Sequence, residues 1–203
     1  NYYGYHNLMG YISGNHDKSR FITLTSGEVS WSEDGKLAGW TREIEDPQAF
    51  AYDRLSMFHA FNQTIPGIPV TYQGDEYGQP GANDPDNRRW MEFDEGELNA
   101  LELKNRSIYT KLTGLRNSEM ALTYGDFQFH TTTENTLAYS RAYFGNQVIV
   151  VFNKSDQPED VEVILREGFD YNQLSEQFGH DFTIEQGVLI VTLPSNSFEI
   201  LTL

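Results

Sequence analysis

The spacing of apolar residues changes once along this chain of 203 residues. Up to about Asn117, short apolar runs alternate with longer stretches whose apolar residues recur every three or four positions, which predicts strands alternating with amphipathic helices. After Met120 the apolar residues fall at every second position, which predicts short antiparallel strands. The change falls near residues 117 to 121. We therefore predict two parts, residues 1–118 and 119–203.

The first part contains two predicted strands, Leu8–Ser13 and Ile68–Tyr72, each followed by a polar loop. A helix is predicted to start at Asp46-Pro47, where Asp can cap the helix and Pro suits its first turn. Its apolar positions are Phe50, Ala51, Leu55, Phe58 and Phe61. A second helix is predicted from Leu101, Ile108, Leu112 and Leu115. This order is typical of βα units with a parallel sheet, and two strands are too few to close a barrel. We expect the first part to be incomplete.

The second part reads as an antiparallel β-sandwich. Leu137, Tyr139, Arg141 and Tyr143 alternate with small residues. Gly145-Asn146 then predicts a hairpin turn into the apolar run Gln147–Asn153. Further short alternating runs follow, separated by turn residues, which is the pattern of a sandwich.

Charge and composition exclude several classes of partner. The formal net charge is -16, so neither nucleic acid nor an anionic membrane surface is an expected partner, whereas a neutral sugar polymer is indifferent to this charge. Solubility alone is the other interpretation of the charge. The apolar runs are too short for membrane insertion. There is no cysteine, so neither a disulfide nor a thiolate metal site is expected, and the scattered histidines predict no metal site.

The start of the sequence, Asn1-Tyr2-Tyr3-Gly4-Tyr5, has neither an initiator Met nor a signal peptide, so we expect the chain to begin inside a longer protein. Tyr2, Tyr3 and Tyr5 either stack on sugar rings or pack in the interior.

Candidate chemistry lies where each predicted strand ends. The first strand runs into Gly14-Asn15-His16-Asp17, and the second into Gly74-Asp75-Glu76. Loops at the carboxyl ends of parallel barrel strands carry the catalytic groups of such barrels. Asp supplies a charge and paired acceptors, and His supplies a donor, which together suit the vicinal hydroxyls of a sugar. The other interpretation is that His16 and Asp17 only order a turn.

Together the two segments resemble the α-amylase superfamily of glycoside hydrolases, family 13. Its seventh barrel strand ends in Asn-His-Asp, as at Asn15–Asp17, and its eighth carries Gly-x-Pro-x-x-Tyr-x-Gly-x-Glu, as at Gly67–Glu76. The loop Pro80–Arg89 is similar to that of the neopullulanase, cyclomaltodextrinase and maltogenic amylase branch. The resemblance implies the last strands and helices of a (β/α)8 TIM barrel, strands seven and eight, followed by an antiparallel β-sandwich C-terminal domain. It also implies a retaining α-glucan hydrolase that cleaves α-1,4 and potentially α-1,6 glucosidic bonds.

The resemblance also implies roles for individual residues. Asp17 corresponds to the catalytic carboxylate that stabilises the transition state, and His16 to its neighbouring hydroxyl donor. Asn15 belongs to the same motif and is expected to bind substrate. Asp84 and Arg88 resemble the pair that contacts the next sugar. Trp90 follows that loop and either stacks on a glucose ring or packs in the interior.

The resemblance further implies that the nucleophile and general acid lie on earlier barrel strands, so the isolated chain should be inactive. Asp75 and Glu76 are not expected to replace them, because adjacent residues on a strand point to opposite faces. No cofactor is expected in this segment, and calcium would belong to the missing part of the enzyme. The expected partners are an α-glucan oligosaccharide or polysaccharide and the missing N-terminal barrel segment.

Several alternatives stay open. A non-catalytic amylase-like barrel used for carbohydrate binding or assembly is the main alternative to an enzyme. Transglycosylation competes with hydrolysis, because water and a sugar hydroxyl can attack the same intermediate. Homo-oligomerisation is undecided, and so is localisation, with a periplasmic or secreted protein slightly favoured.

Overall fold

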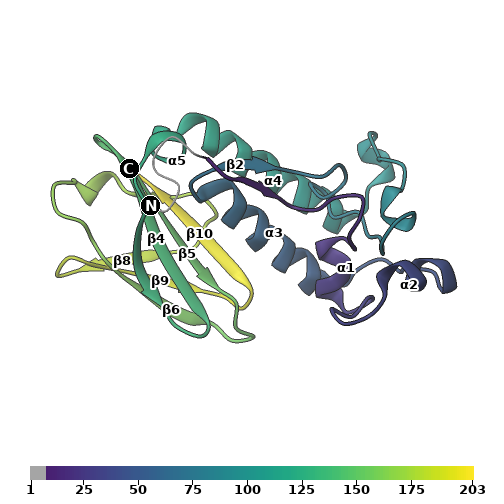
Figure 1. Cartoon of the computed structure of the whole chain (residues 1–203). Helices are drawn as coiled ribbons and strands as arrows, with labels where there is room; N and C mark the ends of the chain where they lie inside the picture. Colours follow the sequence, from purple (N-terminus) through teal and green to yellow (C-terminus); the bar gives the residue numbers. More distant parts are fainter. Residues whose placement is uncertain (1–7) are drawn as a thin grey trace. The chain divides into compact units, whose positions relative to one another are not determined.

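The computed structural model describes residues 8–203 (Figure 1). The chain forms two compact units. The first contains the residues up to 62 together with residues 67–113, and the second contains residues 63–66 and 114–203. The predicted order, a part with strands and helices followed by an antiparallel β part, is confirmed.

The first unit is built around a pair of parallel strands. Its elements are β1 (Gly10–Ile12), α1 (Phe21–Ser26), α2 (Gly35–Thr41), β2 (Ile68–Val70), the 3-10 turns η1 (Asp86–Arg88) and η2 (Glu95–Glu97), and most of α3 (Ala49–Thr64) and α4 (Ala100–Ser118). Gly10 lies opposite Ile68 and Ile12 opposite Val70. Parallel strands require a long crossover between them, which the segment with α1, α2 and α3 provides. The carboxyl ends of β1 and β2 therefore meet at one edge.

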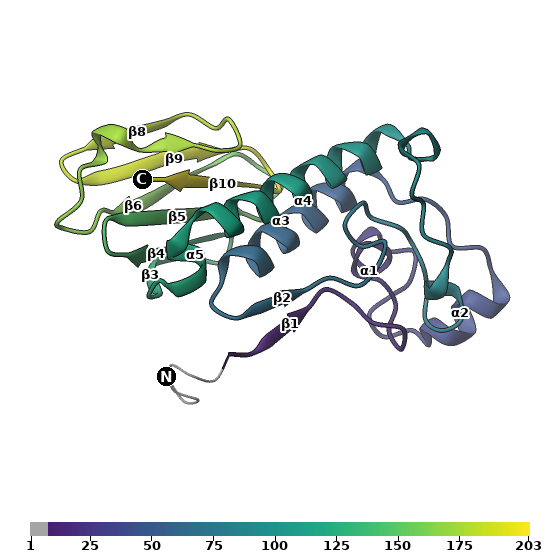
Figure 2. The ribbon, with the colours of Figure 1, turned by 90° about the horizontal axis from the view of Figure 1, so that it is seen from above.

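Helices α3 and α4 lie side by side, as both ribbon views show (Figure 2). The Ser56 hydroxyl on α3 donates to the side-chain oxygen of Asn105 on α4 at 2.8 Å. Ala51 and Leu55 of α3 are buried against Ile22. Phe50 and Phe61 are each 37% exposed, so the apolar face predicted for this helix is buried only in part.

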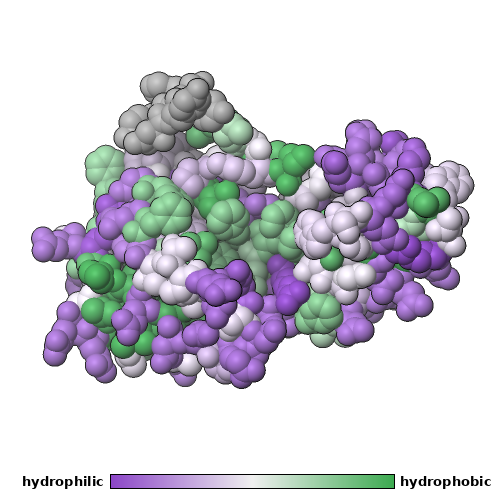
Figure 3. Space-filling model, turned by 60° about the horizontal axis from the view of Figure 1, so that its bottom comes forward, coloured by the Kyte–Doolittle hydropathy of each residue, from purple (hydrophilic) through white to green (hydrophobic). Residues whose placement is uncertain are grey.

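The strand pair keeps apolar side chains at the surface. Ile12, Ile68 and Val70 are 52%, 51% and 46% exposed, and among the residues from 8 onward no third strand joins this sheet. Hydrophobic residues reach the surface in the space-filling view (Figure 3). The exposure is what an incomplete barrel predicts, because barrel strands are normally covered on both faces.

The second unit is a β-sandwich with one short helix. Its elements are α5 (Met120–Tyr124), β3 (Gln128–Thr132), β4 (Thr136–Tyr143), β5 (Asn146–Asn153), β6 (Glu159–Ile164), the 3-10 turn η3 (Tyr171–Gln173), β7 (Ser175–Glu176), β8 (Phe182–Glu185), β9 (Val188–Leu193) and β10 (Ser197–Thr202). One sheet has the order β3-β4-β5-β10-β7 and the other β6-β9-β8. Ile149 and Val151 of the first sheet share a buried core with Val163 and Val191 of the second.

Two local predictions were wrong, and two short helices were missed. Helix α3 begins at Ala49 rather than at Asp46-Pro47. The short helices α1 and α2 were not predicted. The hairpin turn between β4 and β5 is Phe144-Gly145, because Asn146 is already paired with Tyr143. In the described part of the chain, no helix combines the length and apolarity that crossing a membrane requires.

Candidate active-site loops

The loop after β1 begins with a serine that connects the two strands. The Ser13 amide donates to the Val70 carbonyl at 2.9 Å. Its hydroxyl donates to Asp75 Oδ2 at 2.5 Å and accepts from the Tyr72 amide at 2.9 Å. The start of this loop is therefore fixed to the end of β2.

The predicted catalytic segment follows directly and is accessible. The Asp17 amide donates to Asn15 Oδ1 at 2.8 Å, which orders the turn. His16 Nε2 lies 3.4 Å from Asp17 Oδ2, and the two side chains are 56% and 72% exposed. The turn is held by the backbone amide of Asp17, and its carboxylate is largely exposed to solvent.

The loop after β2 carries the second predicted pair. Arg88 Nε lies 2.6 Å from Asp84 Oδ1, and both side chains are partly exposed. Lys36 of α2 reaches within 3.8 Å of the other carboxylate oxygen of Asp84. Asp84 is thus flanked by two cations at the surface.

The structure joins these two loops through Asn87, which sequence reasoning had not identified. Its buried side-chain amide donates to the Asn15 carbonyl at 3.1 Å and to the Lys18 carbonyl at 2.7 Å. The loop with Asp84 and Arg88 is thereby placed beside the loop with Asp17. The motif Asp84–Arg88 contained Asn87, but its partners lie about seventy residues away, so no local signal predicted the contact.

Arg20 is the second residue that sequence reasoning missed. Its side chain is 1% exposed, and it lies 2.8 Å from Asp75 Oδ1. The guanidinium also donates to the carbonyls of Gln73 and Asn87, both at 2.8 Å, and to Gln79 Oε1 at 3.0 Å. One buried cation therefore holds the loop after β1 against four residues of the loop after β2.

Asp75 is a structural group in this arrangement. It is 3% exposed, and burial raises its pKa, whereas the hydrogen bond from Ser13 and the charge of Arg20 act in the opposite direction. The imidazole of His59 on α3 lies 2.8 Å from the Asp75 carbonyl, so Nε2 is the donor there. Burial lowers the pKa of His59 to about 4, which keeps it neutral at pH 7.

Trp90 lies beyond the second loop with its side chain 93% exposed, while its carbonyl accepts from Gln79 Nε2 at 2.5 Å. A packing role is therefore not seen for this ring among the described residues. The predicted stacking positions Tyr2, Tyr3 and Tyr5 lie outside the described residues. Between residues 8 and 203, no three His, Asp or Glu side chains are arranged to hold a metal.

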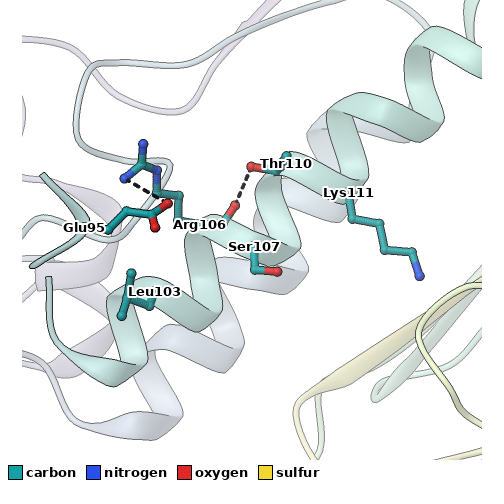
Figure 4. A pocket seen from close by; sticks show the side chains of 6 residues that line it. All are labelled: Glu95, Leu103, Arg106, Ser107, Thr110 and Lys111. Carbon is teal, nitrogen blue, oxygen red and sulfur yellow. Dashed lines mark hydrogen bonds and ion pairs between the residues drawn. The ribbon is translucent and has the colours of Figure 1, made fainter. Parts of the chain in front are cut away.

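An open depression of about 500 Å³ lies elsewhere, on the surface of α4 (Figure 4). It is lined by Glu95, Leu103, Arg106, Ser107, Thr110 and Lys111. Lys111 points away from the facing pair of Arg106 and Glu95, which are 3.9 Å apart. No predicted site residue lines this depression.

The sequence matches that of known families and proteins. Residues 127–200 match the family described as Maltogenic Amylase, C-terminal domain. A cyclomaltodextrinase of Thermoanaerobacter pseudethanolicus is 33% identical over 155 residues, which cover 75% of this chain and 22% of the relative. Neopullulanase 2 of Thermoactinomyces vulgaris is 33% identical over 135 residues, which cover 66% of this chain and 23% of the relative. The chain thus spans less than a quarter of each of these relatives.

Solved structures share the fold. The α-amylase of Geobacillus thermoleovorans, solved in complex with acarbose, superimposes with a TM-score of 0.70 at 22% identity. The superposition covers 96% of this chain and 38% of that structure. The order of a barrel-end part and a β-sheet domain is therefore that of the amylases. The chain belongs to the C-terminal region of the α-amylase family, glycoside hydrolase family 13, on the branch of the cyclomaltodextrinases, neopullulanases and maltogenic amylases.

Proposed function

We propose that this chain is part of a retaining α-glucan hydrolase, to which it contributes the transition-state-stabilising Asp17 but neither the nucleophile nor the general acid. The observation that carries the proposal is the shared edge at which the loops after β1 and β2 meet. Parallel pairing of the strands and the bonds of Asn87 place Asn15–Asp17 beside the loop of Asp84 and Arg88. Catalytic groups of parallel barrels gather at this edge.

The proposed roles follow from accessibility and charge. The exposed carboxylate of Asp17 accepts hydrogen bonds from two neighbouring hydroxyls of the sugar being cleaved, and its charge stabilises the positive charge that develops on that sugar. His16 supplies a donor beside it. Asn15 orders the turn, and Asp84, Arg88 and Trp90 bind the adjacent sugars.

The substrate class is inferred from the relatives. The names of the relatives include cyclomaltodextrinase and neopullulanase, and one structural neighbour was solved with acarbose. An α-glucan with α-1,4 bonds, or with both α-1,4 and α-1,6 bonds, fits these names. The remaining barrel strands, with the nucleophile and acid, would come from a preceding segment of the parent protein, which would also cover Ile12, Ile68 and Val70.

The test is Asp17→Asn in the intact parent protein. We expect kcat for maltooligosaccharides to fall by roughly three orders of magnitude, because the lost charge acts mainly in the transition state. The melting temperature should not change, since Asp17 is bound to the protein through its backbone. Asp53→Asn, which alters an exposed carboxylate of α3, is the control and should keep the wild-type rate. An Asp17→Asn enzyme with a third or more of that rate would refute the assignment.

A further inference from the structure

The turn between β4 and β5 holds a residue that the turn itself does not favour. Phe144 has a φ of 51° and is 86% exposed. A bulky residue is strained in this left-handed region, where two-residue hairpin turns favour Asn, Asp or Gly. An exposed aromatic ring gains nothing from burial either. Neither backbone preference nor burial explains a Phe at this position. Residues held in a strained backbone conformation cluster at functional sites.

Phe144 belongs to a surface cluster that we call the aromatic patch, formed by Met120, Tyr124, Tyr143 and Phe144. The ring centroids of Tyr143 and Phe144 are 4.7 Å apart, and those of Tyr124 and Tyr143 are 5.6 Å apart. Met120 and Tyr124 are 52% and 65% exposed and lie four positions apart, on the same side of α5. Helix α5 and strand β4 are neighbours in the second unit (Figure 2).

The aromatic patch is held in place by Asn146, the residue after the turn. Its side-chain oxygen accepts from the Ala121 amide of α5 at 2.8 Å. Its side-chain nitrogen donates to Glu119 Oε2 at 2.6 Å and to the Leu203 carbonyl at 3.1 Å. The turn and the helix are therefore fixed to each other before any ligand arrives, which lowers the entropy that binding would cost.

The chemistry of the aromatic patch favours a neutral ligand with apolar faces and hydroxyl edges. None of its four members is charged, and the chain's net charge of -16 repels anionic partners and further copies of the chain alike. Within the described residues, no hydrogen bond engages the hydroxyls of Tyr124 and Tyr143, so both can pair with a ligand. A sugar ring presents C–H groups on its faces and hydroxyls around its rim, which match the two parts of a tyrosine.

We propose that the aromatic patch is an α-glucan-binding surface of the second unit. The choice of an α-glucan over other neutral sugars rests on the proposed function. Because the aromatic patch is exposed, we expect it to bind an oligosaccharide weakly, with a dissociation constant on the order of millimolar.

The test is affinity electrophoresis of the 203-residue chain in native gels containing soluble amylose, with dextran gels for comparison. We expect amylose to retard the chain and Phe144→Asn to weaken binding at least fivefold. Asn tolerates the left-handed turn, so this variant should be as stable as the wild-type chain or more so. Phe129→Ala, which removes another exposed ring of the same unit, is the control. This control should be retarded like the wild-type chain.

Three results would overturn the proposal. One is a wild-type chain that amylose does not retard more than dextran does, and another is equal retardation of the wild-type chain and Phe144→Asn. The third is evidence that protein, and not sugar, covers the patch. That evidence would be a dimer in light scattering that Phe144→Asn converts to monomer, or a lower melting temperature of the intact parent carrying Phe144→Asn. Because no result depends on turnover, the proposed function can fail in the Asp17→Asn assay while this binding is observed, and the reverse.

Discussion

The two aspartates that follow the paired strands have opposite surroundings. Asp17, after β1, has a side chain that is 72% exposed, whereas Asp75, after β2, is 3% exposed and pairs with the buried Arg20. The exposed carboxylate of Asp17 is accessible to a ligand. The carboxylate of Asp75 is not, because its two oxygens accept hydrogen bonds from Ser13 and Arg20. The surroundings therefore give Asp75 a structural role and leave Asp17 accessible for the chemical role proposed above.

Replacing Arg88 tests whether the pair of Asp84 and Arg88 binds a sugar. If its pair with Asp84 contacts a neighbouring sugar, Arg88→Ala in the intact parent should lower kcat/KM for maltooligosaccharides about tenfold, the value of one charge-assisted hydrogen bond. An aryl α-glucoside too short to reach this pair should be cleaved at nearly the wild-type rate.

The matched control for that variant is Arg89→Ala. Arg89 pairs with Asp86 within the same loop at 3.0 Å and also donates to the Ile44 carbonyl, so its loss should affect both substrates equally through the loop's fold. Equal losses for Arg88→Ala would assign Arg88 to that structural role as well.

Arg20 tests the structural role of the buried pair. Replacing it with Met should lower the free energy of unfolding by roughly 3–5 kcal/mol, because Asp75 would be left buried without its cation. Arg42→Met removes an exposed pair with Glu33 and should cost far less stability, because solvent screens an ion pair at the surface. Urea unfolding followed by helical circular dichroism measures both, and similar losses for the two variants would contradict the assigned role of Arg20.

At the scale of elements, the parallel pair β1-β2 positions the loops. Helix α3 contacts the loop after β2 through the hydrogen bond from His59 to the Asp75 carbonyl. The strands and the two long helices could be predicted because their apolar spacing is a local property. The helix α1 could not. Its sequence, Phe-Ile-Thr-Leu-Thr-Ser, is rich in β-branched residues, which favour a strand, and packing of Ile22 against α3 decides for a helix.

The same limit applies to the candidate site. Asn15, His16 and Asp17 could be predicted because they are consecutive and follow a strand. Arg20 and Asn87 could not be assigned, since their partners are more than fifty residues away in the sequence. The turn between β4 and β5 was placed one residue late, because Phe144 occupies a position where Gly or Asn is expected.

His59 makes the stability of the first unit depend on pH. Its folded pKa of about 4 lies below the ordinary value of 6.5, so below pH 6.5 the unfolded chain binds a proton that the folded chain does not. The free energy of unfolding is therefore unaffected by His59 above pH 6.5 and falls as the pH is lowered toward 4. The expected fall from this group is about 3 kcal/mol.

His59→Gln keeps a donor for the Asp75 carbonyl but does not titrate. The variant should lose less stability than the wild-type chain between pH 6.5 and 4, as measured by urea unfolding at several pH values. Parallel curves for the two proteins over this range would show that His59 is not the group responsible.

At the scale of the molecule, the two units differ in how complete they are. The second has two sheets that bury a common core, whereas the first has a two-stranded sheet whose Ile12, Ile68 and Val70 are about half exposed. The chain also spans less than a quarter of the cyclomaltodextrinase and the neopullulanase it resembles. These observations support the proposal that a further part of a longer protein completes the active site.

The central claim is that this chain supplies one catalytic carboxylate of a site that the rest of the parent completes. The most direct measurement is the initial rate of reducing-sugar release from amylose and from pullulan by three purified samples. These are the 203-residue chain, the intact parent and the intact parent with Asp17→Asn. We predict turnover by the intact wild-type parent and none measurable by the isolated chain, with Asp17→Asn slower by roughly three orders of magnitude. Turnover by the isolated chain, or a rate for Asp17→Asn near that of the wild-type parent, would contradict the account.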